Sequence, residues 1–339
     1  MTTSERTVRI EPHARTIRTR PEQSVLEAAL DAGLNLPHSC KSGHCSSCRA
    51  LLRTGEIAYA RGRPPGITAA EEQAGYILLC QARALTDLVV EARFIASVGE
   101  VEIKTLPCRI ERLARLAPDV LQVFLRLPAV ETLRFQPGQY LDVLLEGGRR
   151  RSFSIASPPH DSALLELHVR RVAGGGFTER LFAETASGAL WRIEGPIGQF
   201  VYRPGGAPLL MIAGGTGFAP LKSMLRHILE GGIERPIHLY WGARRPQDLY
   251  EEPVLLEWVR RYPRLDFTAV LSEATETHAA HHQLGWVHER VLEDHPDLRP
   301  YEIYAAGPPA MVEAIRSSFP VRGARPTHLY FDSFDYAPR

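Results

Sequence analysis

The sequence predicts a chain of three domains: a small α+β domain, an antiparallel β-barrel and a parallel-sheet α/β domain. A length of 339 residues is more than one domain usually holds. Four cysteine residues gather in the first quarter of the chain. After about residue 207, short strands separated by turn residues give way to strands that alternate with helices. We expect the domains to span residues 1–95, 103–204 and 205–339, with a linker near 96–106.

In the first domain, short apolar runs on either side of Glu11-Pro12-His13 predict a β-hairpin. Ser24 has a glutamate three residues later, which is the capping-box spacing, and therefore predicts the start of a helix. We expect that helix to run from residue 25 to residue 30 and to stop at Gly33. A strand over Arg49–Leu52 should follow.

Between this helix and strand lies the most informative pattern of the chain, C-x4-C-x2-C with a distant fourth cysteine. Its members are Cys40, Cys45, Cys48 and Cys80. Four thiolates at this spacing hold a plant-type [2Fe–2S] cluster, and Gly43 can take the positive φ that such a loop often needs. Zinc sites usually have paired short spacings, and disulfide scaffolds are small secreted chains, so neither alternative fits as well. The pattern predicts single-electron transfer.

The composition excludes several other classes of protein. The net charge of +1 gives no support for binding nucleic acid or an anionic membrane. The first six residues are polar and lack an apolar signal segment. No stretch approaches the roughly 20 apolar residues of a membrane span. With four cysteines committed to iron, and Cys108 predicted to be a buried thiol beside an apolar strand, we expect a reducing cytoplasm.

The second domain is predicted to be an antiparallel barrel, because turn residues separate its short apolar runs at regular intervals. The turn signals are Pro118-Asp119, Pro137-Gly138, Gly147-Gly148 and Pro158-Pro159. Two segments of this domain carry candidate chemistry, Arg151-Ser152-Phe153-Ser154 and Gly175-Gly176-Phe177-Thr178. An arginine can pair with a phosphate, and an aromatic ring can stack on an isoalloxazine. Taken singly, each of these residues is more typical of an exposed charge or a core aromatic.

The third domain opens with a short buried strand, Leu209–Ile212, which is followed by Gly214-Gly215-Thr216-Gly217 and a helix. Glycines at this place let a pyrophosphate approach the free N–H groups of a helix N-terminus. Pro220 is expected at the first position of that helix. The third glycine of G-x-G-x-x-G is absent, so an ordinary strand–helix turn stays open at this point.

In this order, the motifs resemble the ferredoxin–NADP reductase superfamily, in the form that carries an N-terminal plant-type ferredoxin domain. The segment Arg151–Ser154 is similar to the R-x-Y-S flavin motif, and Gly214–Pro220 to the G-G-x-G-x-x-P nicotinamide motif. The segment Glu194–Phe200 looks like the one that closes the flavin domain, and Tyr304–Pro309 like the C-G-P-P motif. The resemblance covers essentially the whole chain. It implies a β-grasp ferredoxin domain, an FAD-binding barrel and a nicotinamide-binding α/β domain.

The resemblance also implies roles for individual residues. FAD would be held by Arg151, Ser152, Phe153, Ser154, His168, Val169, Arg170, Gly175, Gly176 and Thr178. The nucleotide would be held by Gly214, Gly215, Thr216, Gly217, Pro220, Arg244, Arg245, Gly307 and Pro308. Thr216, Ala306, Asp332 and Phe334 would form the hydride-transfer site. For Phe334, simple packing of a terminal strand is the alternative reading.

Two residues depart from the pattern of the superfamily. Phe153 replaces the usual tyrosine, so it keeps an aromatic ring but loses a hydroxyl group. Ala306 replaces the usual cysteine beside the hydride-transfer position. We expect slower or altered hydride transfer, but not its absence, because binding and orientation supply much of the rate.

Two further points rest on weaker sequence patterns: the choice between NADH and NADPH, and a second metal site. Arg244 and Arg245 follow the second strand of the third domain, where arginine can accommodate a 2′-phosphate, but two adjacent arginines are also typical of an exposed surface. We expect NADH, with NADPH as a second substrate. A group of histidines over residues 278–288 lies in a polar stretch without matching carboxylates or cysteines, which favours solvated surface over a metal site.

The resemblance implies electron flow from NADH through FAD and the [2Fe–2S] cluster to a terminal oxygenase component, such as a mono- or dioxygenase or a demethylase. The run Tyr240–Arg245, followed by Asp248–Tyr250, looks more like the branch of CDP-6-deoxy-3,4-glucoseen reductases, which serve a pyridoxamine-phosphate dehydratase. A third reading, an electron carrier with a decayed nucleotide domain, has only Ala306 in its favour. The partner should bind transiently, and charges nearly balance over residues 1–95, so no docking face is predicted.

Overall fold

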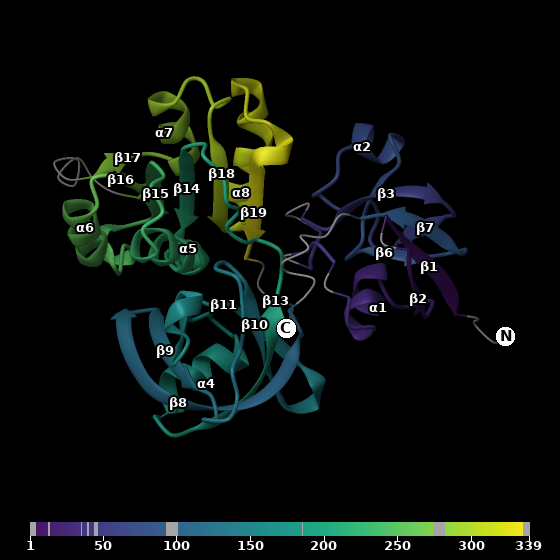
Figure 1. Cartoon of the computed structure of the whole chain (residues 1–339), viewed down its shortest axis with the longest axis horizontal. Helices are drawn as coiled ribbons and strands as arrows, with labels where there is room; N and C mark the ends of the chain where they lie inside the picture. Colours follow the sequence, from purple (N-terminus) through teal and green to yellow (C-terminus); the bar gives the residue numbers. More distant parts are fainter. Residues whose placement is uncertain are drawn as a thin grey trace.

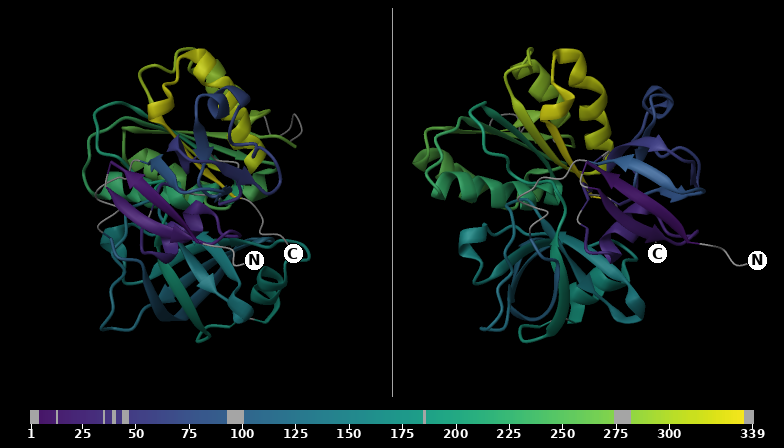
Figure 2. Two further views of the ribbon diagram at one scale, coloured as in Figure 1. Left: turned by 90° about the vertical axis from the view of Figure 1, so that its right-hand side faces the viewer. Right: turned by 45° about the vertical axis from the view of Figure 1, so that its right-hand side comes forward.

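The computed structural model describes residues 5–12, 14–34, 36–38, 41–43, 47–92, 101–184, 186–273 and 282–334. The predicted division into α+β, all-β and α/β parts is confirmed. In Figure 1 the α/β domain lies above the barrel, and the first domain lies beside the junction of the two. Figure 2 shows the same neighbourhood from two further directions.

The first domain is built on a mixed five-stranded sheet in the order β2-β1-β7-β3-β5. Its strands are β1 (Arg6–Glu11), β2 (Arg15–Thr19), β3 (Arg49–Thr54), β5 (Tyr76–Leu78) and β7 (Leu88–Glu91), with a separate pair β4 (Ile57–Tyr59) and β6 (Ala82–Ala84) and helices α1 (Val25–Asp31) and α2 (Ala69–Gln73). The predicted capping box starts α1, since the Glu27 amide donates to Ser24 Oγ and the Ser24 amide to Glu27 Oε2. Gly33, with a φ of +73°, follows the end of the helix as expected.

The second domain is an antiparallel sheet of six strands in the order β11-β10-β13-β8-β9-β12. The strands are β8 (Lys104–Ala117), β9 (Val120–Arg126), β10 (Tyr140–Leu144), β11 (Arg150–Ser154), β12 (Leu165–Arg170) and β13 (Leu190–Ile197), and helix α4 (Gly176–Glu184) follows β12. A bridge between Ile155 and Leu167 joins the two edges, so the sheet closes into a barrel. All four predicted turns fall between strands.

The third domain is a parallel six-stranded sheet in the order β17-β16-β15-β14-β18-β19. Its strands are β14 (Leu209–Gly214), β15 (Ile237–Ala243), β16 (Leu265–Leu271), β17 (Gln283–Leu284), β18 (Glu302–Gly307) and β19 (Leu329–Ser333), and its helices are α5 (Phe218–Glu230), α6 (Glu252–Arg261), α7 (Val287–Asp294) and α8 (Pro309–Ser318). Residues of β14 alternate between two cores: Leu209 and Met211 pack with α5, and Leu210 and Ile212 pack with α7. Helices therefore cover both faces.

Two predicted boundaries are wrong. The linker was expected to extend to residue 106, but β8 begins at Lys104, because Leu106 is buried and pairs with Ile193 of β13. Pro220 was expected at the first position of its helix, but a 3-10 turn over Gly215–Gly217 precedes α5, which begins at Phe218. Pro220 is thus the third residue of α5, still within the first turn, where its missing N–H costs no helical hydrogen bond.

Candidate functional site

Two of the four predicted cluster ligands lie among the described residues, and they are neighbours. Cys48 precedes β3 and Cys80 follows β5, and the Leu79 amide donates to the Cys48 carbonyl across these paired strands (3.1 Å). Both side chains are buried, and neither forms a disulfide. Cys40 and Cys45 lie outside the described residues. A pair of buried thiols on adjacent strand ends is the donor chemistry that an iron–sulfur cluster requires.

The backbone of the cysteine loop is held in an unusual conformation. Lys41 and Gly43 both have positive φ, at +56° and +86°. A Cβ on Gly43 would lie 2.8 Å from Pro64 Cβ, so only glycine fits there. Gln81, next to Cys80, donates from its side-chain amide to the Lys41 carbonyl (3.0 Å). The segment that carries Cys80 therefore supports the loop that carries the other three predicted ligands.

The predicted flavin residues of the barrel occupy β11 and the start of α4. Arg151 and Phe153 are half-buried, and Ser154 is buried. Phe153 lies 5.9 Å from Phe177 of α4, measured between ring centroids, so the two segments are adjacent. Thr178 is buried and its hydroxyl accepts from the Val172 amide (3.0 Å). A Cβ at Gly176 would meet nothing within 4 Å, which leaves the start of α4 open to a ligand.

The glycine loop between β14 and α5 is packed more tightly than the prediction required. A Cβ on Gly217 would overlap the Ala306 carbonyl, and one on Gly214 would lie 2.7 Å from Pro308 Cδ. Gly215 has a φ of +54°. These glycines are thus needed for packing against β18, in addition to any approach of a phosphate. The strand–loop–helix order suits a dinucleotide.

The predicted hydride-transfer residues gather at the carboxyl ends of β14, β18 and β19. Ala306 and Asp332 are partners in the strand pairing, and both are buried. The Phe334 amide donates to the Gly307 carbonyl (2.9 Å), and Thr216 lies in the adjoining glycine loop. Ser333 Oγ is buried without a hydrogen-bond partner among the described residues. A buried polar atom of this kind at a strand end is a place for a ligand group to bind.

Arg244 and Arg245 lie at the end of β15, in a cleft that the Pro118-Asp119 turn of the barrel also lines. Arg170 of β12 contacts Asp119 (3.1 Å), and its guanidinium would be 2.8 Å from a Cβ on Gly215. Asp119 and Arg170 of the barrel therefore lie between the predicted nucleotide arginines and the glycine loop. This arrangement suits the adenosine half of a nucleotide.

The first domain contacts both other domains with the cysteine loop. Lys41 Nζ lies 3.3 Å from Asp142 Oδ2 of β10, and Asp142 Oδ1 accepts from the Ser152 hydroxyl (2.5 Å). Ser47 Oγ donates to the Phe331 carbonyl of β19 (2.9 Å). The predicted cluster site is thus placed beside the predicted flavin strand and the predicted hydride-transfer strand at once.

His38 completes this docking, although no sequence motif singles it out. Its Nδ1 lies 2.6 Å from the Leu36 carbonyl, which can only accept, so the Tyr140 hydroxyl donates to Nε2 (2.9 Å). Burial and the charge of Lys41 lower the pKa of His38 to about 4. The imidazole is therefore neutral at physiological pH. The Gln199 amide donates to the His38 carbonyl (3.3 Å), which adds a second barrel contact.

His168 differs from its predicted role in what its side chain touches. The resemblance implied a cofactor contact for His168, Val169 and Arg170. In the structure the His168 ring is buried against Glu166 and Tyr250, and the Val169 side chain lies in the barrel core. Only the backbone of His168 and Val169 is therefore left to contact a cofactor. Sequence reasoning missed Glu166, Lys222 and Glu251, although Lys222 stands out as a charge within the apolar start of a helix.

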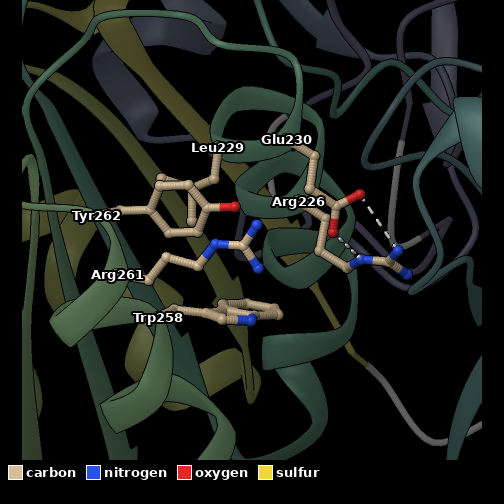
Figure 3. Close-up of a pocket in the computed structure, with 6 residues that line it drawn as sticks. All are labelled: Arg226, Leu229, Glu230, Trp258, Arg261 and Tyr262. Atoms are coloured by element: carbon tan, nitrogen blue, oxygen red, sulfur yellow. Dashed lines mark hydrogen bonds and ion pairs between the residues drawn. The ribbon is translucent and has the colours of Figure 1, made fainter.

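Two other candidate regions do not join this site. His278 and His281 lie outside the described residues, His282 pairs with Glu252 (2.9 Å), and His288 lies on α7. Among the described residues, no histidine of this group belongs to a set with metal-binding geometry. The pocket in Figure 3 is lined by Arg226, Leu229, Glu230, Trp258, Arg261 and Tyr262. These residues belong to or follow the carboxyl halves of α5 and α6, whereas ligands of such sheets bind at the opposite edge.

Comparisons with known proteins agree with this division of the chain. Residues 8–85 match the 2Fe-2S iron–sulfur cluster binding domain family, residues 107–202 the oxidoreductase FAD-binding domain family, and residues 211–317 the oxidoreductase NAD-binding domain family. The chain is 36% identical over 313 residues to the CDP-6-deoxy-L-threo-D-glycero-4-hexulose-3-dehydrase reductase of Yersinia pestis, covering 92% of this chain and 93% of the relative.

Two further similarities concern reductases with other partners. The chain is 34% identical over 320 residues to terephthalate 1,2-dioxygenase reductase component 2 of a Comamonas species, covering 94% of both chains. The solved structure of the Amycolatopsis cytochrome P450 reductase GcoB is similar with a TM-score of 0.78 and 34% identity, covering 97% of this chain and 98% of that one.

Three domains in this order, with thiols, flavin residues and a glycine loop brought together, define an iron–sulfur flavoprotein reductase. The chain belongs to the ferredoxin–NADP reductase superfamily, in the form with an N-terminal [2Fe–2S] domain. Its cofactors are a [2Fe–2S] cluster, FAD and NAD(H). It is an oxidoreductase that passes electrons from NAD(H) through FAD to the cluster. Among the described residues, no helix is both long and apolar enough to cross a membrane.

The residues present fit these groups. FAD, when bound, supplies the change from two-electron to one-electron chemistry, and the cluster supplies a one-electron carrier. Cys48 and Cys80 would hold the cluster, Arg151 and Thr178 the flavin, and the glycine loop the nucleotide. The contacts of Lys41, Ser47 and His38 hold the cluster domain against the other two. His38 and Asp142 are buried at these contacts.

Proposed function

We propose that this chain delivers electrons from NADH to a terminal oxygenase component, with the [2Fe–2S] domain as the exit. The observation that carries the proposal is the position of the cysteine loop, which contacts β10 through Lys41 and β19 through Ser47. Through Lys41 the loop contacts β10, which pairs with the predicted flavin strand β11, and this contact supports a direct electron step from the flavin to the cluster. The dioxygenase and cytochrome P450 reductases to which the chain is similar support an oxygenase as the acceptor.

The individual roles belong to the same proposal. Cys40, Cys45, Cys48 and Cys80 bind iron, and Arg151–Ser154 with Gly175–Thr178 bind FAD. The glycine loop, Gly307 and Pro308 bind NADH, and Thr216, Ala306, Asp332 and Phe334 surround the hydride-transfer position. The proposal also includes the domain limits at 95, 103 and 204, a transient complex with the partner, and a cytoplasmic location. The last agrees with the three described cysteines, none of which forms a disulfide.

The test is a reconstituted assay under air. The purified holoprotein is mixed with NADH and with a purified terminal oxygenase encoded near its gene, and substrate hydroxylation or demethylation is measured against NADH consumption. We expect product formation that needs both proteins, with at least half of the NADH coupled to product. NADH oxidation that is neither accelerated by the oxygenase nor coupled to product would overturn the proposal.

A second acceptor is favoured by a specific observation. The Yersinia relative, 36% identical over 92% of this chain, serves a hexulose dehydrase. The same assay with a pyridoxamine-phosphate dehydratase and its deoxysugar substrate distinguishes the two. Turnover with the dehydratase alone would assign the chain to deoxysugar synthesis.

A further inference from the structure

A buried group of polar residues joins the barrel to the nucleotide domain. We call Glu166, His168, Lys222, Tyr250 and Glu251 the interface cluster. Lys222 Nζ lies 2.8 Å from Glu166 Oε1 and 2.6 Å from Glu251 Oε1. The three charged residues are each at least 94% buried. Ion pairs in such surroundings form only where both partners are held in place.

The members of the interface cluster come from two domains. Glu166 and His168 lie on β12 of the barrel, Lys222 on α5, and Tyr250 and Glu251 just before α6. His168 Nε2 donates to Glu166 Oε1 (2.9 Å), and His168 Nδ1 lies 3.0 Å from the Tyr250 hydroxyl. Lys222 of the nucleotide domain therefore pairs with Glu166 of the barrel as well as with Glu251 of its own domain. A change in the angle between the domains would separate the Glu166 carboxylate from this ammonium.

Lys222 supplies one ammonium to two carboxylates, one from each domain. Burial alone would raise the pKa of Glu166, but hydrogen bonds from His168 and the charge of Lys222 outweigh it and hold that pKa well below its usual range. Glu166, His168 and Glu251 have the spacing of a metal site. The ammonium of Lys222 already supplies a cation to both carboxylates, so these residues form an ion-pair network and not a metal centre.

The interface cluster is connected to the glycine loop by side-chain packing. The Tyr250 ring meets the Trp241 ring edge-on, with centroids 5.0 Å apart. Trp241 Nε1 donates to the Gly215 carbonyl (3.0 Å), and the Trp241 ring stacks on Phe218 at 4.3 Å. Arg170, two residues after His168 on β12, approaches Gly215 from the barrel side. A shift in the interface cluster would thus move the loop predicted to bind the nucleotide.

We propose that the interface cluster is a positioning device that sets the nucleotide domain on the barrel at the angle needed for hydride transfer, with Lys222 as its central positioning residue. The proposal rests on the transfer of electrons from NAD(H) to FAD. It does not depend on which protein finally accepts them. Rates of hydride transfer are sensitive to displacements of an ångström or less, so a small change of angle is sufficient.

The test is the rate constant of flavin reduction at saturating NADH, measured anaerobically by stopped flow for Lys222→Met holoprotein. We expect a fall of about tenfold to hundredfold, with NADH affinity changed less than threefold, because Lys222 is not among the predicted nucleotide contacts. The passage of electrons from chemically reduced flavin through the cluster to cytochrome c should stay unchanged. Lys222→Arg should recover part of the rate.

The matched control is Arg235→Met. Arg235 forms a buried ion pair with Glu302 (2.7 Å) in the nucleotide domain and donates to the Arg203 carbonyl (3.0 Å) in the segment that leads from the barrel into that domain. Among the described residues, its ion pairs and hydrogen bonds include no member of the interface cluster. We expect that variant to lose thermal stability but to keep the rate constant of flavin reduction. Tyr250→Phe removes one hydroxyl and should lower the rate constant by a smaller factor. If Lys222→Met does not fold, this variant tests the proposal in its place. Unchanged rate constants in both interface variants, or an equal fall in Arg235→Met, would overturn the proposal. Neither result bears on the final acceptor, because flavin reduction by NADH is measured without an oxygenase or a dehydratase.

Discussion

At the scale of single residues, the buried cysteines are of two kinds: predicted cluster ligands and a thiol in the barrel core. Cys80 lies on a strand end beside Cys48, whereas Cys108 lies in the barrel core, where burial raises the pKa of its thiol to about 12. We expect Cys80→Ser to lose the visible absorbance and the electron paramagnetic resonance signal of the [2Fe–2S] cluster. The NADH–ferricyanide activity should remain, since it uses the flavin alone. Cys108→Ala is the control, and loss of the cluster in that variant would contradict the assignment.

Ala306 is a second residue whose role can be measured directly. It is fully buried at the end of β18, and the glycine loop packs on its carbonyl. If the thiol usual in the superfamily assists hydride transfer, Ala306→Cys should raise the rate constant of flavin reduction by up to about tenfold, or ~1.4 kcal/mol of barrier. Stopped-flow reduction by NADH checks this. Equal rate constants in the two proteins would show that alanine carries no penalty here.

At the scale of elements, the start of α4 makes a prediction about FAD. A Cβ on Gly176 meets no protein atom within 4 Å, so Gly176→Ala should leave the fold of the apoprotein intact. If a pyrophosphate approaches this backbone, the added methyl group should weaken FAD binding by about tenfold. Flavin retention on gel filtration and titration of the apoprotein measure it. Gly147→Ala, in an open turn of the same barrel, should be less stable because of its positive φ but should bind FAD normally.

The elements that the sequence predicted well are those with local signals. The capping box before α1, the positive φ of Gly43 and the turns of the barrel depend on a few adjacent residues, and the structure contains all of them. The start of β8 was placed wrongly because its first residues are fixed by pairing with β13, more than 80 positions away. No local pattern records such a partner.

At the scale of the whole molecule, docking of the cluster domain should depend on pH through His38. Docked His38 has a pKa of about 4, whereas an exposed histidine has one near 6.5. The undocked form therefore binds more protons in this window, and docking weakens as the pH falls through it. We expect the rate of electron transfer between flavin and cluster, measured by flash photolysis, to fall accordingly.

The control for this prediction uses a second histidine of similar chemistry. His238 also has a pKa lowered to about 4, by burial and by His295, but it lies inside the nucleotide domain. Its protonation should lower thermal stability over the same pH window without slowing the flavin-to-cluster step. His38→Gln should flatten the pH dependence of that step. A pH dependence that survives in His38→Gln would place its origin elsewhere.

The contacts between domains lay beyond the reach of sequence reasoning. Cysteine spacing and glycine motifs point to each cofactor separately, because each is bound by a short segment. Lys41 and Asp142 form an ion pair, and Lys222 contacts Glu166, but the partners are 101 and 56 positions apart. Lysine and carboxylate side chains are normally exposed, and their separation along the chain does not show which of them pair. Only the assembled fold shows which of them are buried together.

The contact between Ser47 and Phe331 joins residues 284 positions apart, near the two ends of the chain. A ribosome makes the cysteine loop early and β19 last. During synthesis, the loop is therefore open on the side that β19 finally covers, for as long as the two later domains are still being made. We expect a cluster to enter the loop more readily before β19 packs against it than afterwards.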